Sequence, residues 1–149
     1  MLRFSKKVEY ALIALMDLAD LREDPVTAKT VAQNYQLPYE LLGKVMQTLT
    51  KNGLLNSVQG VKGGYALGKS PEKISIKEVI EILEGPISIT SCGIHSEDHS
   101  DCDLLSTCTI KSPMEIIQHE LEKYFSNISL KDLRANYYKT SSQPIQITV

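Results

Sequence analysis

Residues 38–67 read PYELLGKVMQTLTKNGLLNSVQGVKGGYAL, and this stretch decides the fold. It predicts a helix from Pro38 to about Asn52, because proline is favoured in the first helical turn and Gly53 suits a left-handed helix end. Two strands are expected next, at 54–58 and 65–67, joined by a glycine-rich turn. The apolar positions of the helix predict a buried stripe of Leu41, Leu42, Val45 and Leu49. The remaining positions face solvent: Tyr39, Glu40, Gly43, Lys44, Gln47, Thr48 and Lys51.

A shorter helix is expected before this stretch, near 27–34, with Thr27 as its cap and a turn at Gln36 and Leu37. Helices joined by such a turn, the last with a polar and basic face, are typical of a helix-turn-helix, and a hairpin directly after it is a wing. A glycine-rich loop also suits a nucleotide, but this one lacks the GK[ST] ending of a phosphate-binding loop. The candidate DNA contacts are Lys29, Tyr39, Glu40, Lys44, Gln47, Gln59 and Lys62.

The net charge of -2 conceals an asymmetry along the chain. Residues 1–70 hold nine Lys and Arg against six Asp and Glu, whereas residues 71–149 hold seven against twelve. Between Lys29 and Lys69 the single acidic residue is Glu40. A basic patch on one module is what phosphate contacts require, although solvated lysines on an ordinary surface give the same count.

Apolar periodicity predicts further helices at 5–21, 75–84, 112–127 and 129–136, and Ser5, Ser75 and Ser112 are the expected caps of the first three. The first helix is apolar around much of its surface, so we expect it to pack on more than one side. The helix at 112–127 has more apolar surface than a lone tail helix needs, which predicts a second subunit against it. Its stripe comprises Ile117, Leu121, Tyr124 and Ile128, beside Met114, Ile116 and Phe125.

The expected fold class is therefore mainly α with a small β-hairpin wing. Its parts are a winged helix-turn-helix at 1–85, a cysteine loop at 86–111, a dimerisation helix with a short following helix at 112–139, and a tail at 140–149. The start of the chain resembles a signal peptide, but Glu9, Asp17 and Asp20 and the lack of a small-residue cleavage site argue against one. No membrane segment is needed, and we expect a cytoplasmic protein whose thiols stay reduced.

All three cysteines, Cys92, Cys102 and Cys108, lie within seventeen residues, separated by nine and then five residues. An odd number of thiols in a polar loop suits a soft metal or an iron-sulfur cluster. The alternatives are a thiol switch, a zinc site completed by a histidine, or three unrelated cysteines with one pair oxidised. A redox enzyme or cluster carrier is poorly supported, because there is no Cys-x-x-Cys pair and no nucleophile with an evident base.

Taken together, these segments resemble the IscR/NsrR family of bacterial iron-sulfur transcription regulators. The residues that carry the resemblance are VEYALIALMDLA at 8–19, LPYELLGKVMQTLTKNGLL at 37–55, SVQGVKGGYAL at 57–67, the three-cysteine loop and NISLKDL at 127–133. The resemblance implies a homodimer in which each subunit offers a winged helix to a double-stranded DNA operator and the long helices cross-pair. It also implies a 2Fe-2S or 4Fe-4S cluster whose state controls DNA binding, and no enzymatic activity.

Two positions depart from the family pattern. IscR-like members have a histidine ligand three residues after the third cysteine, where this chain has Lys111, which cannot ligate when protonated. Other members supply a carboxylate from the first helix in a motif similar to residues 8–12, so Glu9 is the expected fourth ligand, donated across the dimer, with His95 and His99 as rivals. Gly43 stands where IscR places a base-reading glutamate, so the operator sequence is not carried over.

Overall fold

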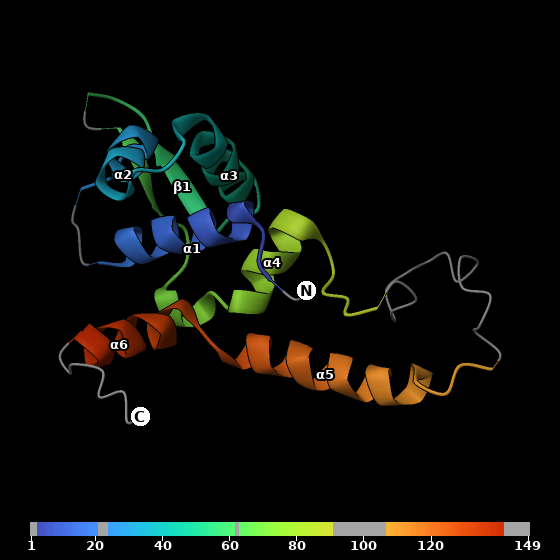
Figure 1. Ribbon diagram of the computed structural model, residues 1–149. Helices are drawn as coiled ribbons and strands as arrows, with labels where there is room; N and C mark the ends of the chain where they lie inside the picture. The colour runs from blue at the N-terminus through green and yellow to red at the C-terminus, as the bar shows by residue number, and fades with distance from the viewer. Residues whose placement is uncertain (1–2, 21–23, 62, 91–106, 142–149) are drawn as a thin grey trace.

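The computed structural model describes residues 3–20, 24–61, 63–90 and 107–141, with the side chains described up to Tyr137. Within these ranges the protein is mainly helical with one antiparallel hairpin, as the sequence predicts (Figure 1). The elements are α1 (Lys6–Ala19), α2 (Ala28–Tyr35), α3 (Tyr39–Lys51), β1 (Leu55–Val58), β2 (Gly64–Leu67), the 3₁₀ turn η1 (Pro71–Lys73), α4 (Ile76–Glu84), α5 (Lys111–Asn127) and α6 (Leu130–Ser141).

The helix-turn-helix is set by local backbone chemistry. The Thr27 hydroxyl accepts a hydrogen bond from the Thr30 amide at 3.1 Å, which caps α2 as expected. Gln36 ends α2 in the left-handed conformation, with φ of 52°, and the Leu37 amide then bonds to the Ala32 carbonyl at 2.8 Å. This tight end turns the chain directly into α3, so the turn predicted at 36–37 is confirmed.

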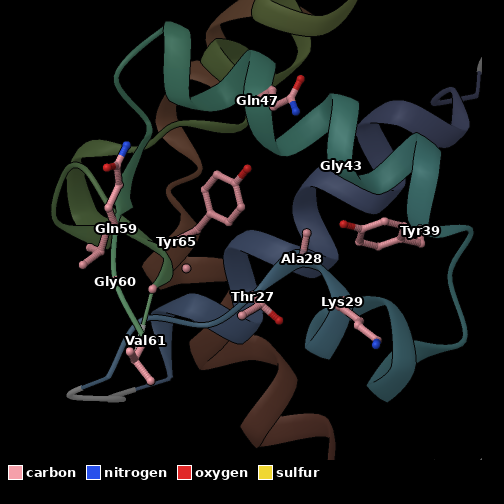
Figure 2. Close-up of a pocket in the computed structure, with 13 residues that line it drawn as sticks. Thr27, Ala28, Lys29, Tyr39, Gly43, Gln47, Gln59, Gly60, Val61 and Tyr65 are labelled. Carbon is pink, nitrogen blue, oxygen red and sulfur yellow. The ribbon is translucent and has the colours of Figure 1, made fainter.

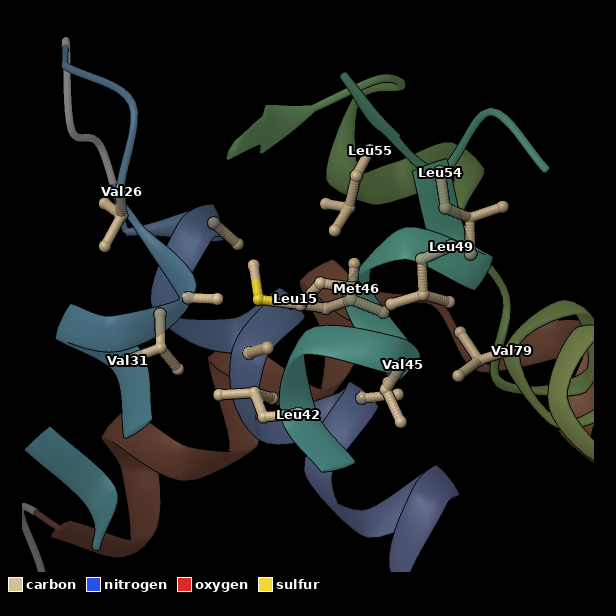
Figure 3. Packing of buried hydrophobic residues seen from close by; sticks show 14 of the residues in the cluster. Leu15, Val26, Val31, Leu42, Val45, Met46, Leu49, Leu54, Leu55 and Val79 are labelled. Atoms are coloured by element: carbon tan, nitrogen blue, oxygen red, sulfur yellow. The ribbon is translucent and has the colours of Figure 1, made fainter. Parts of the chain in front are cut away.

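Helices α1 to α4 and the β1–β2 hairpin form what we call the head. Its core lies among α1, α3 and the strands (Figure 3). On α3 the buried residues are Leu42, Val45, Met46 and Leu49, a regular helical face. Met46 is therefore a core residue that the predicted stripe omitted, and Leu41 is only partly buried. The first helix packs on two sides, as expected: Leu15 joins this core, while Val8 packs with residues of α4 in a second cluster.

The wing is fastened to the segment before α2. Strands β1 and β2 pair from Leu55 with Leu67 to Val58 with Gly64. Beyond them, the Val26 amide donates to the Tyr65 carbonyl at 2.9 Å and the Tyr65 amide to the Val26 carbonyl at 2.8 Å. A Cβ atom at Gly64 would lie 2.7 Å from the Val26 backbone, so glycine is required for this close approach.

Helices α5 and α6 lie end to end beneath the head (Figure 1). They are joined to it by two backbone hydrogen bonds, from the Ile76 amide to the Ile128 carbonyl at 3.0 Å and from the Leu130 amide to the Ile74 carbonyl at 2.8 Å. The start of α6 is capped by Ser129, whose hydroxyl accepts from the Asp132 amide at 3.2 Å. In return, the Ser129 hydroxyl and the Ser129 amide donate to the Asp132 carboxylate at 2.6 and 2.9 Å, and these two hydrogen bonds lower the pKa of that carboxyl.

Some boundaries differ from those expected. Helix α5 begins at Lys111 with Ile110 as its cap, so Ser112 lies inside the first turn and does not cap it. Pro113 is tolerated there because the first amides of a helix have no helical acceptor. Helix α6 continues to Ser141, beyond the predicted end at 136, whereas the predicted last residue of the first helix, Leu21, lies outside the described residues. None of the helices in the described ranges has the length and apolarity to cross a bilayer.

We expect Gly64→Ala to lower the free energy of unfolding by about 1–3 kcal/mol, because the added methyl group pushes β2 away from Val26. Gly43→Ala is the matched control: a Cβ there meets nothing within 4 Å, so it should raise the free energy of unfolding by about 0.5–1 kcal/mol. Urea titrations followed by circular dichroism measure both. Equal effects of the two substitutions would contradict the proposed contact.

Candidate functional site

A groove of about 500 Å³ lies between the start of α2, the outer face of α3 and the wing (Figure 2). Helix α2 lines it with its first residues, α3 with one row of its outer face, and the hairpin with the turn between its strands. The lining residues are Thr27, Ala28, Lys29, Tyr39, Gly43, Gln47, Val58, Gln59, Gly60, Val61, Gly63, Gly64 and Tyr65.

The α3 row consists of Tyr39, Gly43 and Gln47, which are spaced four residues apart and therefore lie one above another on the same helix face. Tyr39 is 58% exposed although it is a large aromatic residue. No atom lies within 4 Å of a Cβ built on Gly43, so the middle of the row is open. An exposed helix row with an aromatic ring, a gap and a carboxamide can contact the edges of bases in a major groove.

Four of the seven predicted DNA contacts meet in this groove: Lys29, Tyr39, Gln47 and Gln59. Glu40 and Lys44 are exposed on α3 but do not line it. The seventh, Lys62, lies outside the described residues.

Sequence reasoning did not name Thr27, Ala28 or Tyr65 as groove residues. The sequence marks Thr27 only as a helix cap, but Thr27 also lines the groove, beside the positive end of α2. Tyr65 enters the groove because its backbone pairs with Val26, a contact between residues far apart in the chain. No local pattern in the sequence signals such a pairing.

The lysines of the basic patch differ in their surroundings. Lys69 donates to a carboxylate oxygen of Glu78 at 2.5 Å, so its charge is largely neutralised. None of the ion pairs formed among the described residues involves Lys29, Lys44 or Lys51. Lys29 lines the groove, while Lys44 and Lys51 are exposed on α3, and all three are candidates for phosphate contacts.

The thiol segment, residues 92–108, lies mostly outside the described part of the chain. Cys92, Cys102, His95 and His99 all fall there. Cys108 is described: it is a half-buried free thiol three residues before α5. Within the described residues, no three His, Cys, Asp or Glu side chains gather to form a metal site.

Glu9 lies near the start of α1, where its carboxylate is 40% exposed and accepts a hydrogen bond from Lys6 at 2.5 Å. The same contact raises the pKa of Lys6. Figure 1 shows residues 107–110 leading into the outer end of α5, whereas α1 lies in the head. Within one chain, the described residues 107–110 therefore lie apart from α1. Three thiols and a carboxylate are a donor set that suits iron.

Helix α5 exposes much of its apolar surface. Ile116 is 64% exposed, Ile117 50% and Tyr124 62%, and the one fully buried residue of this helix is Gln118. Apolar side chains grouped along one exposed helix are typical of a surface that another chain covers.

Comparison with known proteins agrees with this architecture. The profile of the family described as Rrf2, iron-dependent transcriptional regulator, matches residues 4–136. A protein of Aquifex aeolicus that is named as an HTH-type transcriptional regulator is 34% identical over 131 residues, which cover 87% of this chain and 90% of that protein.

Two solved structures are similar over almost the whole chain. The structure of CymR, the global cysteine regulator of Bacillus subtilis, has a TM-score of 0.73 at 28% identity and covers 91% of this chain and 98% of its own. The structure of IscR from T. potens has a TM-score of 0.71 at 28% identity, covering 97% and 93% respectively.

Proposed function

Because the chain belongs to the Rrf2 family of transcriptional regulators and is therefore no enzyme, we propose that it is a cytoplasmic repressor that senses iron-sulfur status, redox state or nitric oxide. In this proposal a homodimer binds a double-stranded DNA operator, and an iron-sulfur cluster of the 2Fe-2S or 4Fe-4S type controls the binding. The observation that carries the DNA-binding part is the groove formed by the start of α2, the outer row of α3 and the wing.

The DNA contacts divide into two kinds. Tyr39 and Gln47 on the α3 row would meet base edges in the major groove, and Glu40 and Lys44 would flank them. Lys29 would bind phosphate beside the positive end of α2, while Gln59 and Lys62 of the wing would follow the neighbouring backbone. The cations supply affinity for any DNA, and the α3 row supplies the preference for one operator.

The exposed apolar surface of α5 supports the proposed dimer. Burying Ile116, Ile117 and Tyr124 against the same helix of a second chain would remove apolar area from water, at about 25 cal/mol for each Å². A two-fold axis through this contact presents two reading heads and so requires a roughly palindromic operator. The proposal further requires that α1 of one chain lie within reach of the other chain's thiol segment.

The proposed ligands are Cys92, Cys102 and Cys108 with Glu9 of the partner chain, and His95 and His99 are the rivals of Glu9. When bound, the cluster supplies a redox-sensitive and nitric-oxide-sensitive set of bonds to iron. A carboxylate binds iron more weakly than a thiolate, so Glu9 would be the ligand that leaves first. Release of Cys108 would act directly on the start of α5, three residues later.

A second candidate keeps the fold but uses the thiols without iron. It is favoured by the similarity to CymR, which is named a cysteine regulator. In that case the three cysteines would act as a thiol switch, or would hold zinc together with a histidine. Iron content and visible absorption of protein purified without oxygen distinguish the two candidates.

We expect Lys29→Ala to weaken binding to specific and random DNA alike and to reduce the slope of log affinity against log salt by about one. Gln47→Ala should instead cost about 1–3 kcal/mol on the operator and little on random DNA. Fluorescence anisotropy over a range of salt concentrations measures both. Lys131→Ala, which removes a lysine of α6 paired with Glu72, is the control and should change neither quantity.

For the cluster, Cys108→Ala should abolish the visible absorption and the bound iron of anaerobically purified protein. Glu9→Gln should retain iron but lose it faster in air, because an amide is a weaker ligand than a carboxylate. His119→Ala, an exposed histidine of α5, serves as the control and should match the wild type. A colourless wild-type protein that binds the operator equally well with and without added iron would exclude the cluster mechanism.

For the dimer, Ile117→Glu should convert the protein to a monomer, because charged carboxylates would be buried in an apolar contact. Sedimentation velocity gives the mass directly. Lys123→Glu changes the charge at an exposed polar position of the same helix and should leave the mass unchanged. A wild-type protein that sediments as a monomer at micromolar concentration would refute the arrangement.

A further inference from the structure

Gln118 is a polar residue where an amphipathic helix would ordinarily bury an aliphatic one. It is 2% exposed and is the one fully buried residue of α5, whereas Ile116 and Ile117 beside it are exposed. Burying a carboxamide costs free energy unless its donors and acceptor are all paired. The hydrogen-bond partners of Gln118 therefore show which segments of the chain this buried side chain connects.

Both ends of the Gln118 carboxamide bind the segment that leads into the thiol loop. Its oxygen accepts a hydrogen bond from the Ile89 amide at 3.0 Å, and its nitrogen donates to the Ile87 carbonyl at 2.5 Å. Ile89 lies three residues before Cys92. The side chain thus pairs with this backbone segment as a neighbouring strand would.

The same nitrogen also donates to Glu122, one turn further along α5, at 2.7 Å. The other carboxylate oxygen of Glu122 accepts from Lys77 of α4 at 2.9 Å. Lys77 also lies 3.5 Å from Glu81 on its own helix, and the hydrogen bond with Glu122 raises the pKa of Lys77. Lys77 lies on α4, and α4 is anchored in the core of the head by the fully buried Val79. These contacts therefore connect Gln118 to the head.

Gln118 therefore holds the chain before the thiol segment against the helix that follows it. Residues 87–89 are bound by the carboxamide, and the chain after Cys108 continues into α5, which carries Gln118. An aliphatic residue would fill the same volume but could not make these hydrogen bonds.

We propose that Gln118 is the positioning residue that ties the chain before the thiol segment to the helix after it and, through Glu122 and Lys77, to the DNA-reading head. This inference rests on the proposed function, because it assigns the route by which occupancy of the thiol segment reaches the operator contacts. Gln118 touches neither the iron ligands nor DNA in this role.

The test compares Gln118→Met, an apolar substitution of similar length, with Lys77→Met and with the control His119→Gln, all in the full-length protein. The first readout needs no metal: hydrogen exchange of the Ile89 amide in the metal-free protein. We expect it to be about threefold to tenfold faster in Gln118→Met, which lacks the acceptor, and unchanged in the other two proteins.

The second readout is the ratio of operator dissociation constants for iron-loaded and metal-free protein. In the wild type this ratio should differ from one by about 5-fold to 150-fold. It should fall to within about twofold of one in both Gln118→Met and Lys77→Met, with iron content retained, and should keep its wild-type value in His119→Gln. If Gln118→Met does not fold, the ratio for Lys77→Met decides.

Three outcomes overturn the proposal. In the first, Gln118→Met weakens both forms equally and keeps the wild-type ratio, which is the result for a residue that only stabilises the fold. In the second, the Ile89 amide exchanges at the same rate in Gln118→Met as in the wild type. In the third, the wild-type ratio is itself one, in which case the sensor proposal fails and this inference fails with it.

Discussion

The structure depends on the joint between residues 74–76 and 128–130, where two backbone hydrogen bonds attach the α5–α6 arm to the winged head. Leu130 is fully buried beside this joint, and Phe125 packs near the first helix, with its ring centroid 5.8 Å from that of Phe4. The arm is therefore held at the C-terminal end of α5, and most of that helix extends away from the head (Figure 1). This geometry leaves apolar side chains of α5 exposed, and that exposure is the basis for the proposed pairing of two arms.

The head, in contrast, is held together at several independent points, so the residues that line the groove keep fixed relative positions. Val26 pairs with Tyr65 and so sets the distance from the start of α2 to the wing, while Leu42 and Leu49 fasten α3 to the core behind it. On the far side of the core, the Tyr35 hydroxyl donates to buried Asp17 at 3.0 Å and fixes the end of α2 against α1. A head held together in this way would bind DNA as one rigid body, so the proposed regulation would act on the position of the whole head.

Local signals predicted most of the fold, and the partners of buried polar groups account for what they missed. Thr27, Ser75 and Gly53 gave correct helix ends because caps and left-handed turns are properties of adjacent residues. Asp17, Tyr65 and Gln118 have partners that lie 18 to 39 residues away, and no periodicity reveals them. The cysteine spacing predicts a class of ligand, but spacing alone does not give the geometry of a site whose proposed donors come from a loop and from a second chain.

The length of α5 would amplify the change that we propose at the thiol segment before it reaches the operator. Its 17 residues span about 25 Å, with Cys108 just before one end and the joint to the head at the other. A tilt of about 5° over that length displaces the far end by roughly 2 Å. Hydrogen bonds to base edges tolerate only about 0.5 Å of variation in length.

In a dimer the two heads would move in opposite senses, so the error at one half-site cannot be corrected by sliding the protein along the DNA. A tilt of a few degrees in α5, caused by a change beside Cys108, would therefore be enough to decide whether both heads of a dimer bind the operator at once.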